Sequence, residues 1–237
     1  MEFKILHLYY DFMNLYGEYG NINILKQYLK NMNNDVVIHQ KTVNDDYNLM
    51  DYDFIYIGSG TEKNLEYVLQ DLKKHKEELL EYINSNKYAL FTGNSYEMLG
   101  KSIDDVETLQ ILNFTVERLK DRKTDDVIME SSFIPNKVVG FINKMSTIKD
   151  NDCPLFSVIF GIGSDKDNKT EGIKHHNLFG TYVIGPILVR NPYFLELIIK
   201  GMYELKGNKI DKIELNENEI KGYELVLSEL ENRMKSK

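Results

Sequence analysis

The fold is decided by the stretch Tyr88-Ala-Leu-Phe-Thr-Gly-Asn-Ser-Tyr-Glu-Met-Leu-Gly100. Its β-rich run, 88–92, breaks at Gly93, and residues able to start a helix follow at once. A strand, a sharp turn and a helix in this order form the pattern of a nucleophile elbow, which holds one side chain at an exposed corner. The amides of the following turn point at whatever sits above that corner. Because the corner residue here is glycine, the pattern predicts such a site without its nucleophile.

Upstream of this stretch, strands alternate with helices. Residues 3–8, 36–39 and 53–57 are predicted strands. Asn21 is predicted to cap a first helix, and residues 62–83 carry the apolar spacing of a second. This alternation predicts a doubly wound, mostly parallel sheet flanked by helices, with ligands at the carboxyl ends of the strands. Glycine-rich turns follow the third and fourth strands at those ends.

Downstream of Gly100 the pattern changes to short β-rich runs, which predict antiparallel strands in the C-terminal half: 127–129, 137–142, 156–160 and 178–183. Pro192 can start a helix, and residues 220–234 repeat apolar side chains at spacings of three and four. We therefore expect one α/β domain over residues 1–206. Residues 207–237 are expected to form an amphipathic helical extension packed on the same domain.

The composition excludes several classes of protein. Of the 237 residues, 28% are charged and 42% hydrophobic, which fits neither a disordered nor a membrane protein. The net charge is −8 and there is no basic stripe, so nucleic acid is not an expected partner. The first residues lack the apolar core of a signal peptide, which predicts a cytoplasmic protein. A single cysteine, Cys153, and five scattered histidines predict neither a metal site nor a cofactor.

Several motifs follow one another in order along the chain. Residues 8–21 read Leu-Tyr-Tyr-Asp-Phe-Met-Asn-Leu-Tyr-Gly-Glu-Tyr-Gly-Asn, and residues 180–188 read Gly-Thr-Tyr-Val-Ile-Gly-Pro-Ile-Leu. Together with residues 53–62, 140–144 and 161–165, they resemble the motifs of class I glutamine amidotransferases of the cobyric acid synthase type. The resemblance is strongest to the glutaminase subunits of lipid II isoglutaminyl synthase. The residues that match the family's motifs are Asp11, Asn14, Tyr16, Gly17, Asn143, Glu171, Thr181 and Tyr182.

The resemblance implies a flavodoxin-like class I glutamine amidotransferase fold, but the functional positions depart from it. Family members read Cys-Gly-Gly-Tyr at the elbow, which places Gly93 at the position of the nucleophile. The same comparison places Ile184 at the position of the histidine base. Glutamine hydrolysis needs a thiolate and a group that moves its proton, and neither glycine nor isoleucine supplies one. Ser59, Thr61 and Lys144 also depart from the family's pattern.

Two other side chains are candidate substitutes. Ser95 follows the elbow in a Gly-x-Ser arrangement, but Glu97 stands where that motif needs glycine, so a helix-start serine is the simpler interpretation. His176 precedes the strand expected to carry the base, although a polar turn residue explains it as well. The backbone is a further candidate, because amides need no side chain to bind an oxyanion. The backbone positions are Gly58, Gly60, Gly93 and Asn94.

These observations favour a pseudoenzyme that lacks glutaminase activity and acts as a binding or scaffolding subunit. In relatives, this fold passes ammonia to a synthetase, so the resemblance implies a Mur-ligase-like, ATP-dependent amide ligase as partner in peptidoglycan amidation. Two alternatives stay open: a binding module for glutamine or a related amino acid, and a hydrolase that uses Ser95. A pocket inherited without any ligand is a further possibility.

Overall fold

The computed structural model describes residues 1–236 and contains two sheets. The larger, central sheet has six strands in the order β11-β12-β4-β3-β1-β2. All neighbouring strands in it are parallel except β11, which pairs antiparallel with β12. The strands are β1 (Glu2–Leu8), β2 (Asp35–Lys41), β3 (Phe54–Ile57), β4 (Tyr88–Thr92), β11 (Ile173–His175) and β12 (Leu178–Thr181).

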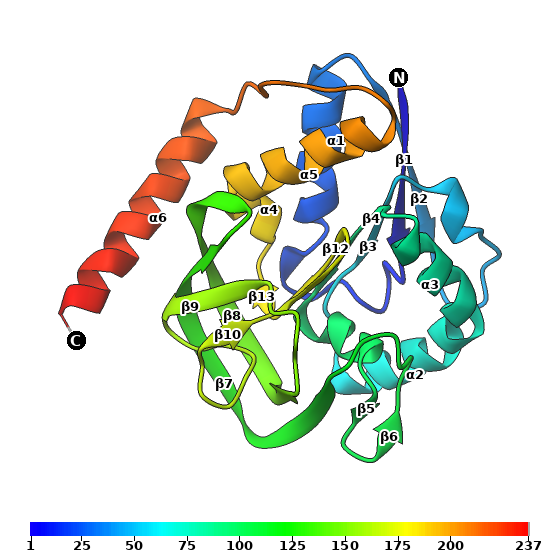
Figure 1. Cartoon of the computed structure of the whole chain (residues 1–237), viewed down its shortest axis with the longest axis vertical. Coiled ribbons are helices and arrows are strands. Elements are labelled where there is room, and N and C mark those ends of the chain that lie inside the picture. The colour runs from blue at the N-terminus through cyan, green and yellow to red at the C-terminus, as the bar shows by residue number, and fades with distance from the viewer. Residues whose placement is uncertain (237) are drawn as a thin grey trace.

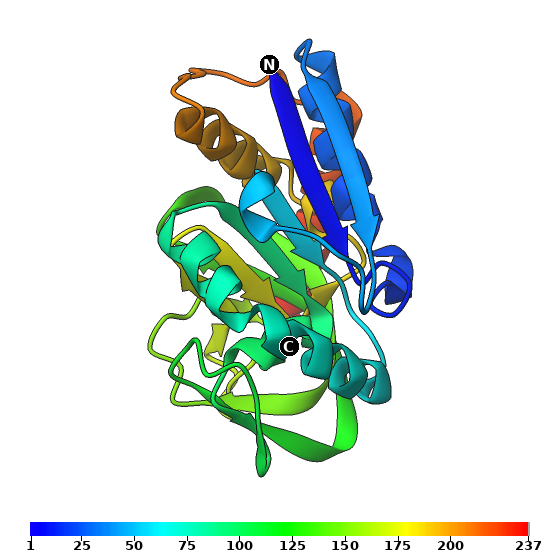
Figure 2. The ribbon, with the colours of Figure 1, turned by 90° about the vertical axis from the view of Figure 1, so that its right-hand side faces the viewer.

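Helices cover both faces of the central sheet (Figures 1 and 2). On one face lie α1 (Gly20–Asn31) and α5 (Pro192–Leu205), and on the other lie α2 (Glu62–Leu72) and α3 (Lys76–Asn84). Because both faces are covered, every residue of β3 and β4 is buried. Their sequences, Phe-Ile-Tyr-Ile and Tyr-Ala-Leu-Phe-Thr, are accordingly almost continuously apolar, as expected for inner parallel strands.

The second sheet is built mainly from a long hairpin of β7 (Thr115–Ser131) and β8 (Ile134–Lys149). β13 joins the hairpin through β8, which brings the chain back beside the central sheet. The remaining strands are β5 (Ser102–Ile103), β6 (Val106–Glu107), β9 (Phe156–Phe160) and β10 (Thr170–Glu171), and β13 spans Val183–Ile184.

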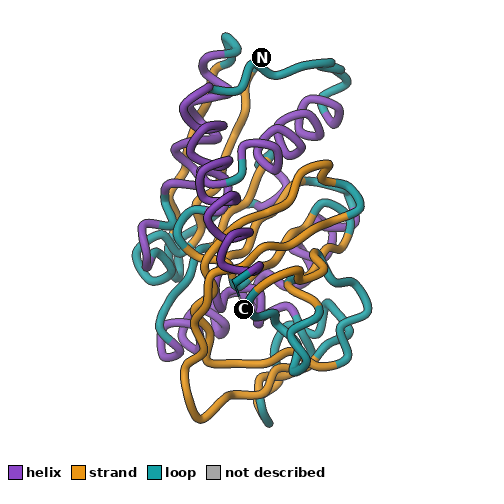
Figure 3. Tube along the Cα trace, turned by 90° about the vertical axis from the view of Figure 1, so that its left-hand side faces the viewer, coloured by secondary structure: helices purple, strands orange, loops and turns teal. Residues whose placement is uncertain are grey.

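The chain ends in helices that connect the two sheets. A short helix, α4 (Ile187–Arg190), contacts α1, and α5 follows it directly. The last helix, α6 (Glu217–Lys235), lies across the second sheet, as Figure 3 shows. Its residues Tyr223 and Leu230 pack with Ile128, Val139 and Phe160 in a small apolar cluster that is separate from the main core.

The fold predicted from the sequence is confirmed: a mostly parallel sheet flanked by helices, followed by antiparallel strands. The predicted runs 127–129 and 137–142 are wrong in extent, because they are only the inner parts of β7 and β8. Beyond these parts the hairpin is a largely polar two-stranded ribbon, so no apolar run marks it in the sequence. The predicted helix 62–83 is likewise divided by a 3₁₀ turn at Lys73–His75.

Two local predictions also need correction. Asn21 does not cap α1 but lies inside its first turn, fully buried. Its amide donates to the Glu18 carbonyl and the Tyr56 hydroxyl and accepts from the Leu188 backbone, so it joins α1 to the sheet and to α4. After the elbow the chain forms a 3₁₀ helix, Gly93–Leu99, in place of an α-helix.

The carboxyl ends of β3 and β4 lie side by side, because the two strands are parallel and adjacent. The turns after them, at Gly58 and Gly93, therefore face the same space, where the Tyr9–Tyr19 loop and the β7–β8 ribbon also meet. None of the helices described for residues 1–236 is long and apolar enough to cross a membrane.

Candidate functional site

The elbow forms at the predicted place but has no room for a side chain. Gly93 adopts a left-handed backbone conformation with φ of +62°, as expected for the corner of a sharp turn. A Cβ atom built on Gly93 would lie 2.2 Å from Ser59 Oγ and 2.3 Å from Ser59 Cβ. Such distances are far inside van der Waals contact. The side chain of Ser59, which arrives from the neighbouring strand, therefore occupies the space in which a nucleophile on residue 93 would stand.

The glycines after β3 allow a close approach of the Tyr9–Tyr19 loop. A Cβ on Gly58 would lie 2.4 Å from the Met13 carbonyl oxygen, and one on Gly60 would lie 2.3 Å from Met13 Sδ. On its other side Gly60 meets Asn94. The Gly60 amide donates to Asn94 Oδ1, and Asn94 Nδ2 donates to the Gly60 carbonyl, both at 3.0 Å. These two glycines are thus held between the loop and the residue that follows the elbow.

Ile184, the expected position of the base, lies in β13 and is buried, with its backbone paired to Phe141 of β8. Its side chain has no group that can accept or release a proton. The next residue, Gly185, donates its amide to Glu18 Oε1 at 2.7 Å. Thr92, which precedes Gly93, donates its hydroxyl to the other oxygen of the same carboxylate. The structure therefore brings the segments of Gly93 and Ile184 together on opposite sides of Glu18.

We call this arrangement the Glu18 network: Glu18, Tyr56, Thr92 and Gly185. Glu18 has no exposed surface, and the Tyr56 hydroxyl donates to Glu18 Oε2 at 2.8 Å. Burial raises the pKa of Glu18 to about 7, although its hydrogen bonds oppose that shift. Sequence reasoning did not single out Glu18. The available signal was an acidic residue at the family's aspartate position within the polar, glycine-containing loop.

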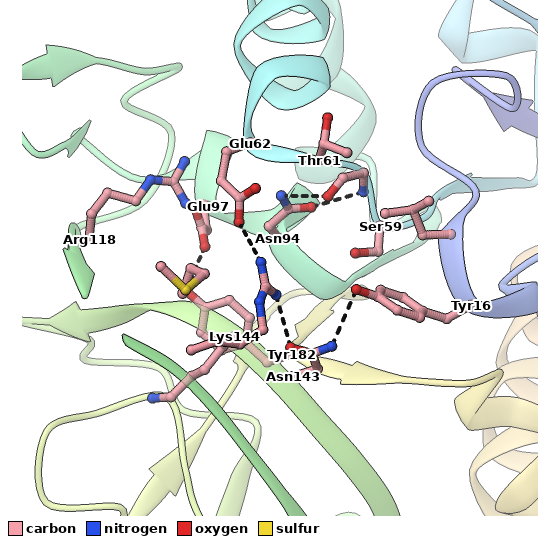
Figure 4. A pocket seen from close by; sticks show the side chains of 14 residues that line it. Tyr16, Ser59, Thr61, Glu62, Asn94, Glu97, Arg118, Asn143, Lys144 and Tyr182 are labelled. Carbon is pink, nitrogen blue, oxygen red and sulfur yellow. Dashed lines mark hydrogen bonds and ion pairs between the residues drawn. The ribbon is translucent and has the colours of Figure 1, made fainter. Parts of the chain in front are cut away.

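Beside the corner lies a small polar cavity of about 90 Å³ (Figure 4). Its walls come from the Tyr9–Tyr19 loop, the turns after β3 and β4, and the β7–β8 ribbon. None of the described residues that line it is a histidine or a cysteine. The charged and polar residues around it include Tyr16, Ser59, Glu62, Asn94, Glu97, Arg118, Arg122, Asn143, Lys144 and Tyr182.

A buried chain of charged and polar groups forms the inner wall of the cavity. Glu97 is 1% exposed and accepts hydrogen bonds from Arg118 Nη1 at 3.0 Å and from the Tyr182 hydroxyl at 2.8 Å. The backbone amide of Tyr182 donates to Glu171 Oε1 at 2.7 Å, and the Thr181 hydroxyl donates to Glu171 Oε2. Burial raises the pKa of Glu171 to about 7. Each carboxylate of this chain is thus held by protein donors.

The mouth of the cavity is crossed by a second set of contacts, which we call the Arg122 latch: Tyr16, Glu62, Arg122 and Asn143 (Figure 4). Arg122 donates to Asn143 Oδ1 at 2.9 Å and to Glu62 at 3.2 Å. Asn143 Nδ2 in turn donates to the Tyr16 hydroxyl at 3.2 Å. Arg122 reaches this position because β7 bulges between Arg118 and Lys123 relative to β8. The latch residues are partly exposed, so solvent weakens these contacts.

Lys144 is almost completely buried at the back of the cavity. Its ammonium group donates to the Ser164 carbonyl at 3.2 Å and lies 5.7 Å from the centre of the Tyr182 ring. Burial lowers the pKa of Lys144 to about 8, although the nearby Glu171, Asp165 and Glu97 favour its charged form. The Lys144 ammonium thus points away from the cavity, whose cationic groups are those of Arg118 and Arg122 (Figure 4). Sequence reasoning had noted Lys144 as a departure from the family's pattern, but neither arginine.

The other matched motif residues shape the loop beside the site and do not line this cavity. Asp11 accepts from the Thr42 hydroxyl, and Asn14 Oδ1 accepts the Tyr19 amide at 3.0 Å. Gly17 adopts a left-handed conformation with φ of +71°, directly after Tyr16 at +62°. These contacts turn the chain so that Glu18 enters the core while Tyr16 stays at the mouth of the cavity.

The two candidate substitutes lie away from the cavity. Ser95 is fully buried, and its hydroxyl donates to the carbonyls of Thr92 at 2.8 Å and Ile57 at 3.1 Å. Ser95 therefore stabilises the turn after β4 from its buried side. His176 lies in the turn between β11 and β12, 2.9 Å from Asn86 Oδ1. Asn86 precedes β4, so His176 lies about 15 Å away from the elbow, at the opposite end of that strand.

No cluster of three or more histidine, cysteine, aspartate or glutamate side chains is arranged to hold a metal ion within the described part of the chain. Cys153, the single cysteine, is half-buried in a loop, and its amide and thiol both contact Asn151. Burial and the neighbouring Asp152 raise the pKa of its thiol to about 11, which disfavours the reactive thiolate.

Comparisons with known proteins find relatives along the whole chain. Residues 4–192 match the model of the CobB/CobQ-like glutamine amidotransferase domain. The chain is 31% identical over 242 residues to a Staphylococcus aureus protein, lipid II isoglutaminyl synthase (glutamine-hydrolyzing) subunit GatD, covering 100% of this chain and 99% of that protein. It is 28% identical to the GatD subunit of Streptococcus pneumoniae, over 80% of this chain and 76% of the relative.

Solved structures show the same fold at lower sequence identity. A glutamine amidotransferase from Thermotoga maritima superposes with a TM-score of 0.53 at 14% identity, covering 98% of this chain and 97% of that one. A second glutamine amidotransferase gives a TM-score of 0.50 at 13% identity, over 85% of this chain and 98% of the other. The chain therefore belongs to the CobB/CobQ-like family of glutamine amidotransferases.

Proposed function

We propose that this chain is a glutamine amidotransferase-family subunit that does not hydrolyse glutamine and that binds or scaffolds an ATP-dependent, Mur-ligase-like amide ligase. The observation that carries the proposal is the contact between Gly93 and Ser59. The corner not only lacks a nucleophile, but its space is filled from the neighbouring strand. A thiolate route to a glutamyl intermediate therefore has no starting group at this position.

The position opposite the corner supports the same conclusion. Ile184 supplies no proton acceptor, and the nearby Glu18 is fully buried with both carboxylate oxygens occupied by donors. Loss of members of a catalytic unit reduces turnover by roughly four to six orders of magnitude in enzymes that use a nucleophile and a base. We expect the chain to release glutamate from glutamine no faster than the uncatalysed background.

The relatives supply the partner part of the proposal. Both are subunits of lipid II isoglutaminyl synthase, an enzyme that is named as glutamine-hydrolyzing. The chain matches the Staphylococcus aureus subunit over its whole length, including the C-terminal segment that contains α6. A subunit of this kind stabilises its ligase by contact, and the ligase then draws on free ammonia.

The test combines activity with recovery of the partner. Purified chain is incubated at high concentration with glutamine, and glutamate release is followed beside the Staphylococcus aureus relative in its own complex as positive control. In parallel, the tagged chain is recovered gently from its source organism and co-purifying proteins are identified. Background glutamate release together with a stoichiometric amide ligase is the expected result. Sustained turnover, or recovery without any ligase, would overturn the proposal.

A second candidate function is supported by the cavity itself. Its wall carries Arg118 and its mouth carries Arg122, and guanidinium groups suit the carboxylate of a small amino acid. Both arginines already hold glutamates of the chain, so a ligand would have to replace Glu62 at the exposed Arg122. Calorimetric titration with glutamine, glutamate and other amino acids tests this. Absence of heat with all of them would leave the scaffolding role alone.

A further inference from the structure

The first residue after the elbow, Asn94, occupies a backbone donor that this architecture normally leaves free for a ligand. In a nucleophile elbow, the oxyanion site consists of the amide after the nucleophile and an amide from the loop of a nearby strand. Here the neighbouring strand is β3, which pairs in register with β4, and its loop offers the Gly60 amide. That amide donates to Asn94 Oδ1 at 3.0 Å. The acceptor of the Gly60 amide is therefore a side-chain carboxamide of the protein and not a ligand.

The orientation of this carboxamide follows from its two hydrogen bonds. The Gly60 amide can only donate and the Gly60 carbonyl can only accept, so Oδ1 must face the former and Nδ2 the latter. Figure 4 shows both contacts as parallel lines between Asn94 and the backbone beside Ser59 and Thr61. The group held there is a primary carboxamide, the same group that ends a glutamine side chain.

The surrounding contacts hold Gly60 in place. Met13 packs where a Cβ of Gly60 would lie, and the Leu15 amide donates to the Ser59 carbonyl at 2.9 Å. Asn64, in the first turn of α2, donates to the Phe12 carbonyl and ties the same loop from the other side. The turn after β3 thus cannot withdraw from Asn94 without breaking several contacts at once.

We infer that Asn94 is a specificity-determining residue whose carboxamide fills the amide-binding position of the site and thereby excludes ligands that bind through a side-chain carboxamide, glutamine above all. This inference rests on the proposed function and extends it. The chain is closed to glutamine at two separate points, Ser59 over the nucleophile position and Asn94 on the Gly60 amide. Replacing Gly93 and Ile184 alone therefore leaves the chain inactive.

The experiment compares three forms of the full chain: the natural sequence, Asn94→Ala and Asn94→Asp. Asn94→Ala removes the carboxamide. Asn94→Asp is a control of the same size, because it keeps an acceptor on the Gly60 amide while it loses the donor to the Gly60 carbonyl. L-Glutamine is titrated into each form by calorimetry. We expect Asn94→Ala to bind glutamine at least tenfold more tightly than the natural chain, and Asn94→Asp to bind no better.

Hydrogen exchange at the Gly60 amide gives a readout that is independent of ligand binding. We expect a slow exchange in the natural chain and at least a tenfold faster exchange in Asn94→Ala, with amides of β1 unchanged as evidence that the variant is folded. The inference would be overturned if the natural chain and Asn94→Ala bound glutamine with equal affinity, or if neither bound it. It would also be overturned if the exchange rate of the Gly60 amide were the same in both.

The same samples separate this inference from the proposed function. Glutamate release is measured in each titration cell after the run. Release by the natural chain would overturn the absence of hydrolysis, while the affinity ratio between the natural chain and Asn94→Ala would still decide the role of Asn94. Equal affinities without any release would overturn the role of Asn94 and leave the proposed function standing.

Discussion

The Glu18 network and the elbow corner adjoin each other but differ in the contacts that their side chains make. In the Glu18 network, one buried carboxylate accepts from two hydroxyl groups and a backbone amide. In the corner, which we define as Ser59, Gly60, Gly93 and Asn94, the chain's own side chains fill positions at which an active amidase would meet its substrate. The network has the polar contacts of a structural element, whereas in the corner Ser59 leaves no room for a Cβ on Gly93 and Asn94 pairs with Gly60.

The difference between the two regions separates residues that stabilise the fold from residues at the position of the family's reaction. Removing Glu18 would leave the Gly185 amide and one of the Tyr56 and Thr92 hydroxyls without an acceptor, and such groups are costly to leave unpaired. Removing the Ser59 side chain at the corner leaves no comparable set of donors unpaired, whereas removing the Asn94 side chain frees only the Gly60 amide and carbonyl. Under the proposed function, the chain keeps the family's architecture around a site that does not perform the family's reaction.

The largest expected effect is that of breaking the Glu18 network. Glu18→Ala leaves the Gly185 amide and one of the two hydroxyls without an acceptor, since Tyr56 and Thr92, 2.8 Å apart, can pair with each other, and we expect the free energy of unfolding to fall by about 3 kcal/mol. Ser59→Gly, at the corner, is expected to cost less than about 1 kcal/mol. Urea unfolding at pH 8 measures both. Similar losses for the two variants would remove the distinction between the two regions.

The pH dependence of stability sharpens the same comparison, because burial raises the pKa of both Glu18 and Glu171 from 4.5 to about 7. Between these values the folded state binds more protons than the unfolded state, so stability increases as the pH falls from 8 towards 5. His7 opposes this below pH 6.5, since burial lowers its pKa to about 4. We expect a net gain of about 2 kcal/mol in the free energy of unfolding between pH 8 and pH 5.5.

Glutamine variants identify the groups responsible. Glu18→Gln and Glu171→Gln keep the size of each side chain but cannot titrate, so each should remove most of the net increase on acidification, because His7 opposes the contribution of the glutamate that remains. Denaturant unfolding over a series of buffers from pH 5.5 to 8 provides the measurement. If the free energy of unfolding of the natural chain does not change with pH, these carboxylates are already ionised in the folded protein. The same follows if the double variant with Glu18→Gln and Glu171→Gln shows the same pH dependence as the natural chain.

The smallest effect is expected at the Arg122 latch. Arg122 and Glu62 are both more than 40% exposed, so Arg122→Ala should change the free energy of unfolding by less than about 1 kcal/mol. Arg118→Ala should cost about 2 kcal/mol or more, because it leaves the buried Glu97 without its cation. Thermal unfolding of the two variants side by side provides the test. An equal cost would mean that the latch is part of the core and not a surface contact.

Much of the fold could be predicted from the sequence because its inner strands are short apolar runs that end in glycine turns. The β7–β8 ribbon could not be predicted in full, since its outer parts are polar and no apolar periodicity distinguishes them from a loop. Asn21 was misassigned for a related reason. Its position before an apolar helix face suggests a cap, and only tertiary packing reveals that its amide is buried against Tyr56.

The backbone turns of the candidate site could be predicted from the sequence, but the side chains that fill it could not. The turns at Gly58, Gly60 and Gly93 follow from local sequence. The close contact between Ser59 and Gly93 depends instead on the spacing between two parallel strands, which the sequence does not state. Its one signal was serine in place of glycine between Gly58 and Gly60. Arg122 reaches the cavity through the bulge in β7, which follows the regular pair of Arg118 with Ser146, and no sequence pattern marks that bulge.

The position of β12 in the central sheet also affects how the chain assembles during synthesis. β4 pairs with β12 in parallel, yet the whole segment 93–177 separates them in sequence. At roughly 5–20 residues per second, a ribosome needs on the order of ten seconds to make that segment. During this interval the apolar edge of β4 has no neighbour on one side, and an open strand edge of this kind invites pairing with other chains. During synthesis the strand that carries the elbow is therefore a place where the nascent protein can pair with other chains.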